Sequence, residues 1–300
     1  MRINKNKIYA LTLILFTVTY GQINTGEVRT IDLSTISEVN AGNSYITFGG
    51  GLGNSKPLWF EGNIIPNFFL RQSDDSRLMG VITPQIIIRM YQEESLPVRT
   101  PSYMPQLTMY YLLSDQKNTD RLCVYGRLAH HSNGQEGNFY LENGNININS
   151  GNFSTNYYEV GLIKTLFDPN LNAVQFIRTS FEIHPPKLTD KELEGKYSLY
   201  RWHNVFSIFK LSDDKKMINK KKANISIKGE ATWMYGQVNT WNDVSLQRLN
   251  LSVTLFYHPD FLEDVGLFVQ IYHGNDYYNI NFSQKLDIIR FGIMTEKLRL

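Results

Sequence analysis

A histidine and a serine stand two positions apart in the stretch of residues 121–133, RLCVYGRLAHHSN. In an extended chain, side chains at positions i and i+2 share one face and lie about 7 Å apart at Cα, so the ring of His130 can reach the oxygen of Ser132. A serine hydroxyl is a weak nucleophile until a base takes its proton. The pair therefore predicts nucleophilic chemistry at Ser132, with His130 as the base.

Such a base needs a partner that orients its other ring nitrogen. The next predicted strand, residues 155–167, places Asn156 on the same face as Tyr158 and Val160, opposite Glu159. Neighbouring strands lie about 4.8 Å apart, which brings their side chains within hydrogen-bond reach. An amide oxygen can fix the tautomer of a histidine without adding a charge that lipid would penalise. Asn156 is therefore the predicted orienting residue.

The elements that must position these residues are strands. From about residue 43 onward, segments rich in β-branched and aromatic residues alternate with clusters of Asn, Asp, Gly, Pro and Ser. This pattern is typical of β-strands separated by turns. Many segments reach ten residues or more, longer than the usual strand of about five to six and long enough to cross a bilayer when tilted. The predicted strands are residues 43–52, 56–70, 80–92, 104–114, 121–133, 155–167, 173–184, 198–210, 224–236, 248–258, 265–273 and 286–297.

These twelve segments predict an all-β fold, a transmembrane antiparallel β-barrel. Bacterial barrels have an even number of strands, and closure leaves no unpaired backbone edge in hydrocarbon. The long connections at 134–154 and 185–197 are expected outside the cell, and the short ones at 168–172 and 259–264 on the periplasmic side. The lysine-rich connection 211–223 is long on the side where short turns are expected.

Composition excludes several other classes of protein. The chain has 300 residues, and aromatic residues make up 13% of it, which is too many for a disordered chain. The longest apolar run, residues 8–18, is shorter than the roughly 20 residues of a spanning helix. A net charge of +2 gives no basic field for nucleic acid. The single cysteine, Cys123, excludes an intramolecular disulfide and a thiolate metal cluster.

The N-terminus predicts export. Residues 1–21 combine a basic head, an apolar run and a small-residue end, which is the pattern of a secretory signal cleaved after Gly21. Residues 22–42 are predicted to be an N-terminal extension, and residues 43–300 to be the barrel.

The barrel gives the histidine and serine an unusual position. Arg121 and Arg127 share one face of their strand. Because arginine side chains that face lipid destabilise a barrel, that face is expected to line the lumen. His130 and Ser132 then continue the opposite, apolar column that contains Leu128. They are expected on the lipid side, near the outer leaflet.

Several of these residues resemble a known family, the outer-membrane phospholipase A family of Gram-negative bacteria. The family has a His-x-Ser-Asn-Gly core, and this chain has His130-His131-Ser132-Asn133-Gly134-Gln135. Two further stretches are similar to the family and contain Pro97, Arg99, Tyr103, Pro105, Gln106 and Leu107 in one case, and Gln270, Tyr272 and Gly274 in the other. The resemblance covers the chain in patches from about residue 80 to 280.

The resemblance implies calcium-dependent hydrolysis of phospholipid acyl esters by a twelve-stranded barrel in the outer membrane, active as a homodimer. Ser132 would be the nucleophile, His130 the base and Asn156 the orienting residue. The family's calcium ligands would fall on the carbonyl of Gln135, on Asn152 and on Ser95 of the second subunit. Oxygen donors of this kind suit a hard cation.

The spacing of the site departs from the family. Ser132 and Asn156 lie 24 positions apart (156 minus 132), which is longer than the family's usual gap. Asn145, Asn147 and Asn149 lie inside this insertion and are less attractive alternatives to Asn156.

Three other functions remain as alternatives. A lipid A deacylase also uses His-x-Ser-Asn, but within a smaller barrel and with a glutamate partner, here Glu142. A porin or structural barrel would carry a degenerate site. A soluble α/β-hydrolase is disfavoured because the chain has no Gly-x-Ser-x-Gly elbow.

Overall fold

A computed structural model describes residues 31–70, 76–115, 120–211, 223–259, 261–262, 264–295 and 298. The predicted signal at 1–21, the first part of the predicted extension at 22–30 and most of the lysine-rich connection, residues 212–222, lie outside the described residues.

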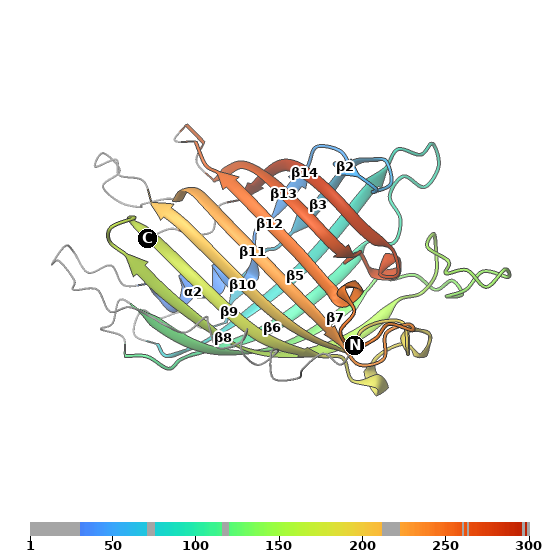
Figure 1. Ribbon diagram of the computed structural model, residues 1–300, viewed down its shortest axis with the longest axis horizontal. Coiled ribbons are helices and arrows are strands. Elements are labelled where there is room, and N and C mark those ends of the chain that lie inside the picture. The colour runs from blue at the N-terminus through green and yellow to red at the C-terminus, as the bar shows by residue number, and fades with distance from the viewer. Residues whose placement is uncertain are drawn as a thin grey trace, which may run out of the picture.

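The described chain forms a closed antiparallel barrel (Figure 1). Its strands are β1 (Tyr45–Thr47), β2 (Leu52–Gly53), β3 (Leu58–Ile64), β4 (Phe68–Phe69), β5 (Leu78–Tyr91), β6 (Ser102–Leu112), β7 (Arg121–Ser132), β8 (Ser154–Asp168), β9 (Ala173–Ile183), β10 (Tyr200–Leu211), β11 (Ala223–Tyr235), β12 (Leu249–Tyr257), β13 (Val265–Asn275) and β14 (Lys285–Thr295). The ring runs through β1, β3 and β5 to β14 and closes where β1 pairs with β14. This confirms the predicted twelve-stranded barrel.

The first two predicted strands are each broken into two pieces. Residues 43–52 become β1 and β2, which both pair with β14, and residues 56–70 become β3 and β4, which both pair with β5. Between β3 and β4 stands Pro66, which has no N–H for the ladder. In β2, Gly53 has φ +132°, and a Cβ there would lie 1.9 Å from the carbonyl oxygen of Asp287. Only glycine allows the strands to approach so closely.

The two faces of the strands differ as the alternation predicts. In β7, Leu128 is 50% exposed on the outer surface, whereas Tyr125, Ala129 and His131 are buried in the lumen. In β12, Leu251, Val253 and Leu255 are exposed while Ser252 and Thr254 are buried. The outer face of the barrel is thus apolar and its lumen is partly polar, which is the pattern expected of a barrel in lipid.

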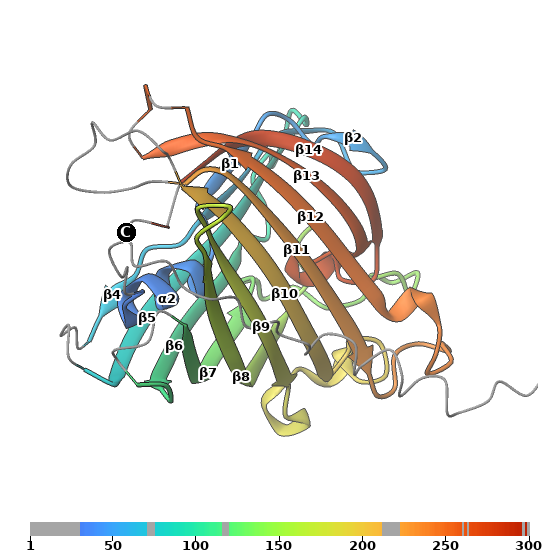
Figure 2. The same ribbon diagram turned by 60° about the vertical axis from the view of Figure 1, so that its left-hand side comes forward.

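A helix inside the lumen was not predicted. Helix α2 (Leu33–Ala41) begins at Asp32, whose carboxylate accepts a hydrogen bond of 2.7 Å from the backbone N–H of Thr35. It packs against β5 and β6, and Figure 2 shows it at one mouth of the barrel. Ile36 is fully buried there in an apolar cluster that includes Tyr125 and Phe176. The part of the extension that the structure describes therefore closes this mouth, the one at which β7 begins.

The described part of the chain contains no helix that is both long and apolar enough to cross a membrane.

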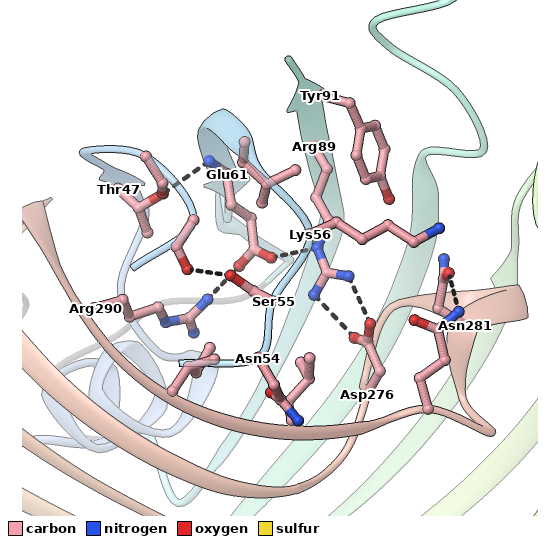
Figure 3. A pocket seen from close by; sticks show the side chains of 16 residues that line it. Thr47, Asn54, Ser55, Lys56, Glu61, Arg89, Tyr91, Asp276, Asn281 and Arg290 are labelled. Atoms are coloured by element: carbon pink, nitrogen blue, oxygen red, sulfur yellow. Dashed lines mark hydrogen bonds and ion pairs between the residues drawn. The ribbon is translucent and has the colours of Figure 1, made fainter. Parts of the chain in front are cut away.

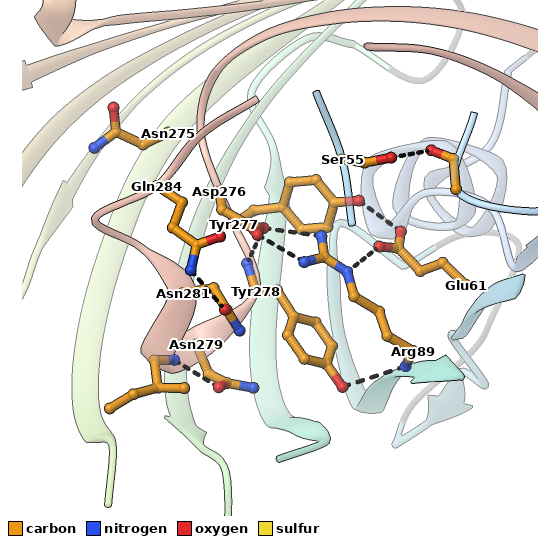
Figure 4. Close-up of polar contacts among 12 residues, drawn as sticks. Ser55, Glu61, Arg89, Asn275, Asp276, Tyr277, Tyr278, Asn279, Asn281 and Gln284 are labelled. Atoms are coloured by element: carbon orange, nitrogen blue, oxygen red, sulfur yellow. Dashed lines mark hydrogen bonds and ion pairs between the residues drawn. The ribbon is translucent and has the colours of Figure 1, made fainter. Parts of the chain in front are cut away.

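Ion pairs lie on the lumen side of the wall nearer the other mouth, where β7 ends. Arg89 of β5 binds Glu61 of β3 through Nε at 2.7 Å and binds the carboxylate of Asp276 through both terminal nitrogens at 2.6 and 2.8 Å (Figure 3). Arg290 of β14 reaches the other oxygen of Glu61 at 2.5 Å. The hydroxyl of Tyr277 also donates to Glu61, so Tyr277 and Arg89 both bind the carboxylate of Glu61 (Figure 4). These buried pairs join strands from both ends of the sequence where the ring closes, because β14, β1, β3 and β5 are neighbours in the barrel wall.

Candidate active site

The register of β7 and β8 brings the predicted base and its orienting residue together. His130 stands directly opposite Asn156 in the antiparallel ladder, and Ser132 stands opposite Ser154. His130 Nδ1 and Asn156 Oδ1 are 3.0 Å apart. Both side chains lie on the outer face, which Leu128 and Val160 continue with large exposed surfaces. The predicted pair therefore lies on the apolar exterior of the barrel.

The second contact of Asn156 determines which tautomer of His130 fits. Asn156 Nδ2 donates a hydrogen bond of 2.9 Å to the backbone carbonyl of Leu188. Because a carbonyl can only accept, the NH2 group of the amide must face Leu188 and the oxygen must face His130. The ring then carries its hydrogen on Nδ1, and Nε2 keeps a lone pair that can accept a proton.

Ser132 lies on the same face, two residues along the strand from His130. It is half-buried and stands between Tyr103 of β6 and Ser154 of β8. Among the described side chains, no hydrogen bond joins Ser132 to His130. The structure thus brings His130 and Asn156 into contact and places Ser132 on the same face, two residues along the strand, without a hydrogen bond to His130.

The long insertion loops out beyond an intact pair of strands. Asn133, which is fully buried, closes its base: Nδ2 donates to the carbonyl of Gly151 at 2.8 Å, and Oδ1 accepts from the backbone N–H groups of Gln135 at 3.2 Å and Phe153 at 3.1 Å. Gly134 follows with φ +64°, a conformation that favours glycine. The 24-position gap therefore does not separate His130 from Asn156.

An aromatic cluster fixes the insertion to two other loops at the same mouth. The cluster consists of the buried side chains Phe139, Phe153, Leu193, Tyr197, Ile280 and Phe282. They come from the loops β7–β8, β9–β10 and β13–β14. The insertion is thus packed onto the barrel.

The alternatives to Asn156 lie inside this loop. The side chain of Asn147 is used within the loop, where Nδ2 donates to the carbonyl of Asn138 and to Ser150 Oγ, each at 3.1 Å. Asn145 and Asn149 are exposed, as is Glu142, the predicted acid of a deacylase. The structure places none of these side chains against the ring of His130.

The predicted calcium ligands lie at the same mouth as the site. Gln135 follows directly after the base of the insertion, and Ser95 is exposed in the β5–β6 loop. Asn152 Nδ2 donates to a carboxylate oxygen of Asp190 at 2.9 Å, and Asp190 was not predicted from the sequence. No group of three or more His, Cys, Asp and Glu side chains able to hold a metal occurs in the described ranges. A cation here would therefore need amide, hydroxyl and backbone oxygens in addition to a carboxylate such as Asp190.

Asp190 is a half-buried carboxylate close to the candidate site. Burial raises the pKa of its carboxyl above the usual range, although the backbone N–H of Ser154 and the amide of Asn152, which both interact with the carboxylate, act in the opposite direction. A bound cation would favour the ionised form and lower this pKa again. Asp190 can be identified as a candidate ligand only from its position beside Asn152 in the structure, because the two residues are 38 positions apart in the sequence.

Three solved structures have a similar fold. Outer membrane phospholipase A from Escherichia coli superposes with a TM-score of 0.56 at 13% identity over 88% of this chain and 98% of that one. An active-site mutant of the E. coli protein, with an asparagine changed to alanine, gives 0.52 at 15% identity over 92% and 94%. The Salmonella typhi outer membrane phospholipase dimer with bound calcium gives 0.54 at 14% identity over 84% and 90%.

The likeness is one of fold. No family model matches the sequence, and no curated protein matches it. The predicted resemblance is therefore confirmed at the level of the barrel, which this chain shares with the outer-membrane phospholipases A over most of its length.

Proposed function

We propose that this protein is a calcium-dependent outer-membrane phospholipase A that hydrolyses the acyl esters of glycerophospholipids. The observation that carries the proposal is the contact between His130 and Asn156 on the apolar outer face, with Ser132 two residues away. An ester can approach such a site sideways while its acyl chains stay in hydrocarbon.

Ser132, His130 and Asn156 divide the chemistry among them. Nε2 of His130 takes the hydroxyl proton as Ser132 Oγ attacks the ester carbonyl and forms a bond to its carbon. Oδ1 of Asn156 holds the Nδ1–H of the imidazolium that results. Collapse of the intermediate breaks the bond to the alcohol, which leaves with the proton from Nε2. Water, activated by the same base, then hydrolyses the acyl-serine.

The donors near the site fit a calcium ion. Gln135, Asn152 and Asp190 offer carbonyl, amide and carboxylate oxygens, which are the ligands that a hard cation prefers. When bound, the ion would supply positive charge where the carbonyl oxygen becomes negative. Ser95 of a second copy would complete the ligands in a homodimer. The Salmonella typhi phospholipase with the same fold is a dimer with bound calcium.

A non-enzymatic porin is the main rival, and the lumen argues against it. Helix α2 packs into one mouth, and the β13–β14 loop folds over the other, where Asn279 donates to Ser102 Oγ of β6 and Phe282 joins the aromatic cluster. We expect the folded protein to give no stable channels in planar bilayers. Open-channel conductance of porin size would favour the rival. The twelve-stranded barrel also disfavours a lipid A deacylase, for which a smaller barrel is expected.

A fluorophosphonate probe tests the proposed nucleophile. Such probes react with serines that a base activates, so we expect the refolded wild type to be labelled at Ser132 and the His130→Ala variant to lose labelling. Ser154, directly opposite on β8, gives a matched control, since Ser154→Ala should be labelled like the wild type. Equal labelling of Ser132→Ala and wild type would refute the assignment.

A further inference from the structure

The segment after β9 covers the beginning of β8, the part of the strand that contains Asn156. Strand β9 pairs with β8 only from Tyr158 onward, so residues 154–157 have no strand partner on that side. Residues 185–190, called the strap here, take this place. Thr189 forms a β-bridge with Thr155, and the N–H of Asp190 donates to the carbonyl of Ser154 at 3.0 Å.

The strap presents one carbonyl to the site. A short 3-10 helix, Pro186–Leu188, turns the carbonyl of Leu188 toward Asn156, which donates to it at 2.9 Å. This contact holds the amide in the orientation that offers Oδ1 to His130. If the amide rotated by half a turn, its NH2 group would face the N–H of the ring, and the other tautomer of His130 would be favoured.

A chain of hydrogen bonds anchors the strap through the barrel wall. Thr189 Oγ1 lies 2.8 Å from Thr155 Oγ1, which lies 2.9 Å from His184 Nδ1. On the lumen side, His184 Nε2 and Glu182 Oε1 are 2.7 Å apart. Thr155, His184 and Glu182 are all buried, and Glu182 is held in turn by Arg201 at 3.0 Å.

We propose that Thr155 and Thr189 are positioning residues of the active site: through the strap they hold Asn156 so that His130 keeps its hydrogen on Nδ1. The proposal rests on the proposed function for the role of the three site residues. It adds that the orientation of Asn156 is set from the lumen, by side chains that touch neither substrate nor the ring of His130.

Thr155→Val tests the anchor, because valine keeps the shape of threonine and removes the hydroxyl. The loss of one buried hydrogen-bond link should lower kcat by about threefold to tenfold with little change in KM. Thr155→Ser restores the hydroxyl and should recover most of the rate. Thr165→Val is the matched control, since Thr165 is equally buried on the same face of β8 but at the far mouth, where it accepts from the backbone of Arg121. That variant should keep the wild-type rate.

A double variant separates this linkage from a general loss of stability. Thr155 and Thr189 share one contact, although Thr155 also contacts His184 and Thr189 also donates to the carbonyl of Pro185 at 3.0 Å, so Thr155→Val combined with Thr189→Val should cost clearly less than the sum of the two single changes. Fully additive losses would contradict a shared anchor.

The tautomer of His130 gives a readout that does not depend on activity. In protein labelled with 15N-histidine, two-bond correlations distinguish a ring with its hydrogen on Nδ1 from one with it on Nε2, and His130→Gln identifies the resonance. We expect the Nδ1–H form in the wild type, in Thr155→Ser and in Thr165→Val, and a mixture in Thr155→Val. A pure Nδ1–H form in Thr155→Val would overturn the proposal, whatever the activity of that variant. An inactive wild type with the expected tautomers would instead contradict the proposed function and leave the positioning intact.

Discussion

The base of the insertion is held by one side chain whose removal has a calculable effect. Asn133 is fully buried and makes three hydrogen bonds, to Gly151, Gln135 and Phe153. Asn133→Ala leaves the three backbone groups without their partner, at a net cost of about 1 kcal/mol each, or about 3 kcal/mol together. If the lost free energy destabilises the closed loop relative to its locally opened form, the fraction of molecules with an open loop should rise roughly 100-fold.

Limited proteolysis of the refolded protein measures that opening. We expect cleavage within residues 134–153 to accelerate strongly in Asn133→Ala, because the cleavage rate follows the open population when reclosing is fast. Asn138→Ala is the matched control: its side chain is exposed in the same loop, and only its backbone carbonyl is used, by Asn147. Equal cleavage rates in Asn133→Ala and the wild type would refute the account of the loop base.

Three further predictions concern the site and the lumen. Asn156→Ala should lower kcat by roughly tenfold to a hundredfold in a hydrolysis assay, because the hydrogen bond to the imidazolium is charge-assisted; an unchanged rate would exclude Asn156 as the orienting residue. Asp190→Asn should raise the calcium concentration needed for half-maximal activity, since it removes the carboxylate beside Asn152, and calcium titrations that superpose on the wild type would remove Asp190 from the ligands. Ile36→Ala should lower the free energy of unfolding by about 2–5 kcal/mol in urea titrations, because Ile36 is fully buried between α2 and the barrel; a loss below about 0.5 kcal/mol would contradict the position of α2.

The strands could be predicted well from the sequence because one simple pattern governs them. Alternation along β12 separates Leu251 and Val253 from Ser252 and Thr254, and the same period in β7 placed His130 outward and His131 in the lumen. Since Asn156 follows from that same period in the next strand, its side of the barrel could be predicted as well.

Contacts between loops and across the lumen could not be predicted in this way. The position of Asp190 beside Asn152 depends on how two long loops pack, and no local pattern records it. Helix α2 is short, and its apolar residues are buried only because they pack against the apolar part of the lumen near Tyr125, which no local sequence pattern indicates. The breaks in the first two strands had local signals, the run Gly49-Gly50-Gly51 and Pro66, but these also occur in ordinary turns.

The most direct test of the central claim is phospholipid hydrolysis by the refolded protein in detergent micelles, with calcium and with a chelator, for the wild type and Ser132→Ala. The account predicts release of fatty acid by the wild type with calcium, little release with chelator and none by Ser132→Ala. Release that persists in Ser132→Ala, or none from a correctly folded, dimeric wild type with calcium, would contradict it.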